Sequence, residues 1–128
     1  ARAAVARESG APLVFAEVEV VLDADTPAAD RLAVLDEAAD WPESGRLRHV
    51  GSPEALVALL RQLAESVDGV RLHPAVLAAD LPVLTGRVLP ELSATGLWQA
   101  PRPGATLRDT LGLPRPANRF AAPAATHA

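Results

Sequence analysis

The chain has 128 residues, of which 49% are hydrophobic and 3% aromatic, and its formal net charge at neutral pH is −4. That length supports one hydrophobic core, and the apolar content exceeds that of a disordered chain. All 12 basic residues are Arg, and they form no basic stripe, which argues against nucleic-acid binding. The absence of Cys excludes disulfides, thiolate metal sites and a cysteine nucleophile.

The first half of the chain predicts a helix, a strand and a second helix. Residues 1–9 are strong helix formers, and Gly10 is a natural stop. Residues 12–22 predict a strand with one wholly apolar face and a second face that carries Glu17 and Glu19. A helix then opens at Pro27, with Thr26 as its expected cap. We expect its buried stripe to be Ala28, Leu32, Leu35 and Ala39, and we expect residues 40–48 to form a loop.

The second half repeats the alternation of helix and strand. Ser52-Pro53-Glu54 starts a helix that runs to about Val67, with apolar residues at helical spacing. A short strand is predicted from Val70 to His73. A last helix follows from about Asp80 to Thr95, kinked at Pro90 and stopped by Gly96. The tail beyond it predicts at most one helical turn, at Thr106 to Leu111. The residues expected to be buried in the two helices are Leu56, Leu59, Leu60, Leu63, Val67, Leu81, Leu84, Val88 and Leu92.

This order predicts an α/β fold with two parallel strands joined by a right-handed crossover. A pair of strands is marginal alone because each strand leaves an open edge. The chain also contains no Met. We therefore expect it to be a piece of a longer protein, with residues 1–96 forming strand–helix units and residues 97–128 an extended tail.

Several sequence marks from His49 onward occur in an order that resembles a known family. They are GSPE at 51–54, VDG at 67–69, HPAVL at 73–77 and VLPEL at 88–92, followed by GATLRDTLGLPRPANRF at 104–120. Together they are similar to the closing section of the luciferase-like, flavin-dependent monooxygenases. The tail resembles the branch that includes nitrilotriacetate and dibenzothiophene-sulfone monooxygenases.

The resemblance implies the C-terminal part of a (β/α)8 TIM barrel. Residues 13–22 would form roughly its seventh strand, residues 70–73 its eighth, and residues 80–95 the closing helix. It also implies an oxidoreductase that uses molecular oxygen with reduced FMN, or with a deazaflavin coenzyme, on a small organic substrate. Such barrels need about 250 residues. The chain would lack most of the flavin cradle, and we expect it to bind no flavin and to be inactive alone.

Barrel active sites lie at the carboxyl ends of the strands, which makes His73 the candidate catalytic residue. It would contact flavin or substrate, or it is a loop histidine held by Pro74. Arg71 shares its face and is the candidate for cofactor binding; the alternative is a solvated or ion-paired strand residue. Glu17 and Glu19 project together, either as a catalytic pair or as polar residues of a barrel interior or rim.

For the remaining candidate residues, the sequence pattern favours structural roles. Gly51-Ser52-Pro53 is a helix start rather than a phosphate loop, and Ser52 lacks the frame of a hydrolase nucleophile. Trp98 and Phe120 are expected to anchor the tail to the outside of the barrel or to a partner subunit, with substrate stacking as the alternative. The three histidines, His49, His73 and His127, are too dispersed for a metal site.

The composition and the resemblance also lead to expectations about the protein's source, location and partners. The Arg-for-Lys composition favours a GC-rich bacterial source. With no apolar run of about 18 to 20 residues and no secretory signal, we expect a cytoplasmic protein without membrane contact. The expected partner is the remainder of the barrel or a second copy of the chain. The alternative to an enzyme fragment is a non-catalytic barrel remnant that dimerises or completes another chain.

Overall fold

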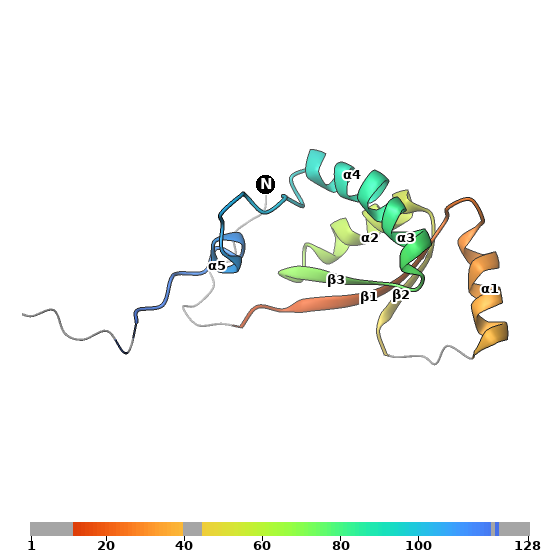
Figure 1. Ribbon diagram of the computed structural model, residues 1–128, viewed down its shortest axis with the longest axis horizontal. Coiled ribbons are helices and arrows are strands. Elements are labelled where there is room, and N and C mark those ends of the chain that lie inside the picture. The colour runs from red at the N-terminus through yellow and green to blue at the C-terminus, as the bar shows by residue number, and fades with distance from the viewer. Residues whose placement is uncertain (1–11, 40–44, 119, 121–128) are drawn as a thin grey trace, which may run out of the picture. The chain divides into compact units, whose positions relative to one another are not determined.

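The computed structural model describes residues 12–39, 45–118 and 120, and the chain divides after Trp98 into two compact units. Unit 1 contains a three-stranded, fully parallel sheet in the order β2-β1-β3 (Figure 1). The central strand is β1 (Phe15–Leu22), flanked by β2 (Leu47–Gly51) and β3 (Gly69–Pro74). The α/β class and the parallel pairing of the two predicted strands are confirmed. The helix predicted over residues 1–9 lies outside the described residues.

The prediction of two strands is wrong, because a third strand, β2, begins at Leu47, near the end of the expected loop (40–48), and continues to Gly51, just before the expected helix start. Its residues pair with the edge of β1 that faces away from β3, from Val18 opposite Leu47 to Leu22 opposite Gly51. The segment is short and carries two charged or polar residues, Arg48 and His49, so its own sequence gives no clear strand alternation. Its backbone becomes a strand because the free edge of β1 supplies hydrogen-bond partners.

Of the two helices that follow β1 and β2, the second begins at the predicted Pro53, whereas the first begins at Ala28, one residue after the predicted Pro27. α1 spans Ala28–Ala38 and α2 spans Pro53–Leu63, so α2 ends one turn before the predicted Val67. Ser52 caps α2 as expected, since its Oγ accepts a hydrogen bond from Ala55 N at 3.1 Å. The cap of α1 differs from the prediction. Asp23 Oδ1, and not Thr26, accepts from Ala28 N at 2.7 Å.

The last helix of unit 1 runs through three consecutive segments. They are α3 (Leu77–Val83), the π-helical η1 (Leu84–Val88) and α4 (Leu89–Ala94), so the helix starts three residues earlier than predicted. Pro90 cannot donate a backbone hydrogen bond to the preceding turn, and the wider π-helical turn lies directly before it. Gly96 stops the helix as predicted, with a φ of 73° and Leu97 N bonded to Leu92 O at 2.9 Å.

The core lies between the sheet and the helices that cover one of its faces. Figure 1 shows α2, α3 and α4 on the same side of the sheet, whereas α1 stands beyond the carboxyl end of β1. The apolar face of β1 contributes Val18, Val20 and Leu22 to a buried cluster completed by Leu56, Val57, Leu60, Leu84, Val88 and Leu92. The predicted stripe of α1 is buried only at Ala28, and Ala39 is exposed. The prediction for α1 fails because the helix lies at the end of the sheet rather than across it.

Unit 2 begins at Gln99, and its described residues contain one short helix, α5 (Leu107–Thr110), within the predicted helical turn. Thr106 and Asp109 form a capping box: Asp109 N donates to Thr106 Oγ1, and Thr106 N donates to Asp109 Oδ2 at 2.8 Å. The assignment of unit 1 to a barrel and of unit 2 to an enzyme tail stays a prediction. In the described part of the chain, no helix is both long and apolar enough to cross a bilayer.

Candidate functional site

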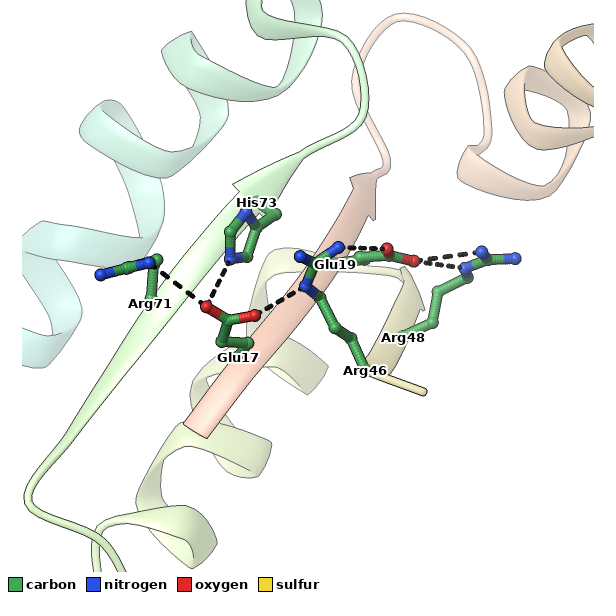
Figure 2. A network of polar contacts seen from close by, with 6 residues as sticks. All are labelled: Glu17, Glu19, Arg46, Arg48, Arg71 and His73. Atoms are coloured by element: carbon green, nitrogen blue, oxygen red, sulfur yellow. Dashed lines mark hydrogen bonds and ion pairs between the residues drawn. The ribbon is translucent and has the colours of Figure 1, made fainter. Parts of the chain in front are cut away.

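The second face of β1 carries charged side chains that meet charged partners on both neighbouring strands. The parallel register places Glu19 opposite Arg48 of β2, and it places Glu17 opposite Arg71 of β3. His73 stands opposite Glu19. Residues paired across a sheet point to the same face, so these side chains converge. We call the group the charged face; it consists of Glu17, Glu19, Arg46, Arg48, Arg71 and His73 (Figure 2).

Glu17 contacts three members of the charged face with its two carboxylate oxygens. Oε2 accepts a hydrogen bond from Arg46 Nε at 2.7 Å. Oε1 accepts from Arg71 Nη1 at 3.3 Å and lies 3.7 Å from His73 Nε2. Glu17 is therefore the residue through which β3 and the segment before β2 are linked across β1.

Glu19 is more deeply buried than Glu17 and binds the arginines of the β2 side. Its Oε2 accepts from Arg48 Nε at 3.0 Å, and Arg46 Nη1 lies 3.5 Å from Oε1. The side chain of Glu19 is 5% exposed, against 37% for Glu17. Burying a carboxylate is unfavourable unless it is paired with a positive charge. Arg48 and Arg46 supply that positive charge for Glu19.

The arginines keep Glu17 ionised. The hydrogen bond from Arg46 holds the pKa of Glu17 below its ordinary value, and the charges of Arg46, His73 and Arg71 act in the same direction. The same hydrogen bond raises the pKa of Arg46. Two glutamates neutralised by arginines do not have the opposed environments of a catalytic acid and base. The geometry favours ion-paired polar residues over a catalytic pair, and their place in the interior or at the rim of a barrel stays a prediction.

His73 and Arg71 lie together on the charged face, as the alternation of β3 predicts. His73 is the penultimate residue of β3 and so lies near the carboxyl end of the strand, where barrel enzymes place their chemistry. Its Nε2 atom is buried and makes no hydrogen bond with any residue that the structure describes. Arg71 is 70% exposed, and its guanidinium contacts Glu17. Both residues remain candidates, and their catalytic and cofactor-binding roles stay predictions.

A second polar cluster, missed in the sequence, lies at the carboxyl end of β1. Asp80 of α3 is fully buried, and its carboxylate accepts from Leu22 N at 3.0 Å and from Val76 N at 2.9 Å. Arg31 of α1 donates to Asp80 Oδ1 at 2.9 Å and to the backbone oxygen of Leu22. We call this group the Asp80 clamp, since it ties α1 and α3 to the end of the central strand. In the sequence, the one sign of this cluster is that Asp80 stands among apolar residues near the start of a predicted helix.

The other predicted candidates have structural surroundings. Gly51 ends β2 and Ser52 caps α2, which agrees with a helix start rather than a phosphate loop. Trp98 packs against the core of unit 1, and Phe120, in unit 2, is 88% exposed. Among residues 12–39, 45–118 and 120, no three His, Cys, Asp or Glu residues group as metal ligands.

Sequence comparison relates the chain to monooxygenases over part of its length. It is 32% identical over 74 residues to N-acetyl-S-(2-succino)cysteine monooxygenase of Bacillus subtilis, a match that covers 56% of this chain and 17% of that protein. It is 34% identical over 82 residues to nitrilotriacetate monooxygenase component A of Aminobacter aminovorans, covering 62% of this chain and 18% of that protein. No family model matches the chain, and no solved structure does. The chain thus spans less than a fifth of these relatives and shares with them a distant monooxygenase relationship.

Proposed function

We propose that this chain is the C-terminal part of a flavin-dependent monooxygenase with a luciferase-like barrel. The partial similarity to two monooxygenases supports the reaction class. The parallel sheet supports the architecture, because its helices α2, α3 and α4 lie on one side and its other face is polar. The parent enzyme would oxidise a small organic substrate with molecular oxygen and a reduced flavin, either FMN or a deazaflavin.

The charged face is the observation that carries this proposal. In a closed barrel the helices surround the strands, and the side chains of the opposite face point inward. Here the inward-pointing set would be the charged face, with His73 toward the carboxyl end of the strands. An isolated three-stranded sheet gains little from a network of partly exposed ion pairs. The same network enclosed by further strands would line a polar pocket.

Two residues of the chain fit an anionic cofactor or substrate. Arg71 is 70% exposed, and its Nη1 lies 3.3 Å from Glu17, its one ion-pair partner among the residues that the structure describes, so most of its donors face outward. A guanidinium with free donors suits a phosphate of the cofactor or a carboxylate of the substrate. His73 beside it would contact the bound molecule. When bound, the flavin would supply the redox chemistry, and these residues would supply binding and proton transfer.

The proposal is tested by titrating the chain with FMN while its fluorescence is followed. We expect no stoichiometric binding at micromolar FMN by the chain alone, because the greater part of the cradle would come from other strands. We expect binding and monooxygenase activity when the reading frame upstream of Ala1 is included. The longer protein with Arg71→Ala should bind FMN or substrate more weakly, and Arg87→Ala, on α2's side of the sheet, is the matched control. Tight binding of FMN by the 128-residue chain would contradict the proposal.

A second candidate function is a non-catalytic module that pairs with another chain. The described sheet favours it because the outer edges of β2 and β3 carry no further strand. Open edges and an uncovered face promote association with a second sheet. Analytical ultracentrifugation separates the two functions. A stable, folded homodimer without flavin affinity supports the module, whereas a monomer that gains flavin binding only in the longer protein supports the enzyme.

A further inference from the structure

His73 and Glu17 approach each other on the charged face without completing a hydrogen bond. His73 Nε2 lies 3.7 Å from Glu17 Oε1, beyond hydrogen-bond distance. The same nitrogen is buried and has no hydrogen-bond partner in the described part of the chain. A buried imidazole nitrogen without a partner is unfavourable, and a small rotation of either side chain would complete the bond. Catalytic hydrogen bonds are often long in this way before a ligand is bound.

The surroundings of Glu17 fix its position and its charge. Arg46 Nε holds one carboxylate oxygen at 2.7 Å, so the other oxygen is directed toward β3. Arg71 Nη1 reaches that second oxygen at 3.3 Å, next to the imidazole of His73. The charge of the carboxylate is maintained by these arginines, as the lowered pKa of Glu17 reflects. His73 thus faces an anion that is oriented from the opposite side by Arg46.

We propose that Glu17 is a positioning residue that holds the proton of neutral His73 on Nε2 and leaves Nδ1 to accept a proton from a ligand on the charged face. The ligand would lose one proton, which forms a bond to Nδ1, and the resulting imidazolium would be balanced by the carboxylate of Glu17. A carboxylate that orients an imidazole in this way selects its tautomer. The proposal rests on the proposed function for the nature of the ligand, but the tautomer itself is a property of the free chain.

The other charged groups near His73 do not replace Glu17 in this role. Arg71 and Arg46 carry only donors, so neither can accept the Nε2 proton. Glu19, opposite His73 in the register, already binds Arg48 at 3.0 Å and Arg46 at 3.5 Å. Glu17 Oε1 is the carboxylate oxygen that lies at ion-pair distance from the imidazole.

The test is an NMR experiment on the full chain that correlates the ring nitrogens and carbons of each histidine near neutral pH. In the unmodified chain we expect His73 to show the widely separated nitrogen shifts of a single tautomer with the proton on Nε2. In Glu17→Ala the two shifts should move toward each other as the tautomers mix. Glu17→Gln should restore the Nε2 tautomer, since the amide oxygen can accept the same proton. That rescue separates positioning of the proton from a purely structural effect.

His49 is an internal reference, because its Nε2 lies 3.1 Å from Ser52 O and the residue stands opposite Val20, on the other face of the sheet from Glu17. Its signals should not change in either variant. Glu54→Ala, which removes an exposed carboxylate bound to Arg87, is the matched control and should leave His73 unchanged. An Nδ1-protonated His73 in the unmodified chain, or signals unaltered by Glu17→Ala, would overturn the proposal. If Glu17→Ala does not fold, failure of Glu17→Gln to keep the Nε2 tautomer overturns it instead. None of these outcomes depends on flavin binding, so the proposed function is tested separately.

Discussion

On one face of β1, Val18, Val20 and Leu22 pack into a core covered by helices, whereas on the other face Glu17 and Glu19 bind arginines. The two faces use the same strand and differ only in the alternation of its side chains. The apolar face is stabilised by burial, which requires no partner outside unit 1. The charged face depends on ion pairs, which contribute little to stability where the groups are exposed, as at Arg71, and more at the buried Glu19. The comparison indicates that the apolar face contributes most of the stability, and it leaves the charged face as the candidate for function.

The largest expected effect comes from the Asp80 clamp, a charged group on the helix-covered side. Asp80→Ala leaves the guanidinium of Arg31, which is 14% exposed, without its carboxylate. Breaking a buried ion pair in this way costs about 3–5 kcal/mol. We expect a matching fall in the free energy of unfolding measured by urea denaturation. Asp36→Ala, at an exposed position of α1, is the control, and an equal effect of the two variants would show that the clamp contributes nothing.

A comparable effect is expected from a cavity on the apolar face. Leu56 of α2 is fully buried in the core cluster. Leu56→Ala should lower the free energy of unfolding by about 2–5 kcal/mol, since a buried side chain is lost and the space refills only in part. Val34→Ala, at a position of α1 that is 65% exposed, should change it by less than about 0.5 kcal/mol. Chemical denaturation of both variants tests whether burial dominates on this face.

A smaller effect is expected for Glu19 on the charged face. Glu19→Gln removes the charge that binds Arg48 and Arg46, and charge-assisted hydrogen bonds contribute about 1.5–3 kcal/mol. The exposed pair of Glu54 with Arg87 is the comparison, and Glu54→Gln should change stability by roughly 0–1 kcal/mol. If thermal melting shows a loss for Glu19→Gln as large as that for Leu56→Ala, the charged face is as important for the fold as the apolar face.

Acid should weaken the charged face through Glu17. Its folded-state pKa lies below the ordinary value of 4.5, mainly because Arg46 donates a hydrogen bond to it. Its contribution to stability is therefore present above the unfolded pKa and is lost as the pH falls below 4.5, through the lower folded pKa. Thermal melting over this range should show a smaller acid-dependent decrease in Glu17→Gln than in the unmodified chain. Parallel decreases in the two proteins would argue against this role.

The smallest effect is expected where an aromatic ring borders the charged face. A Cβ atom at Gly69 would lie 2.4 Å from Cε1 of Phe15, so Gly69→Ala forces that ring to move. Phe15 is 49% exposed and can rotate outward, which limits the cost to about 1 kcal/mol. The double variant Phe15→Ala and Gly69→Ala should remove the conflict. A double-mutant cycle measured by denaturation would contradict the contact if it gave strictly additive effects.

Local sequence determined the alternation of strands and helices, the starts of α1 and α2, the stop at Gly96 and the two faces of β1. These features depend on residues close together in the chain: a capping residue, a proline, or a glycine with positive φ. They also depend on the spacing of apolar residues, which recur every second residue in a strand and about every fourth in a helix. The sequence also placed Glu17 and Glu19 on one face of the first strand, and Arg71 with His73 on one face of the later strand; the sheet register brings the two pairs onto the same face. The sequence pattern could not predict which carboxylate pairs with which guanidinium, because that depends on the register of the sheet.

Tertiary structure alone decided the third strand, the partners on the charged face and the Asp80 clamp. β2 is a strand because β1 offers it an open edge, and its charged residues give no local pattern. Arg48 and Glu19 are 29 residues apart, Arg71 and Glu17 are 54, and Asp80 and Leu22 are 58. The physical reason is that periodicity reports which face a residue occupies, whereas a contact depends on how distant segments are brought together by the packing of the whole sheet.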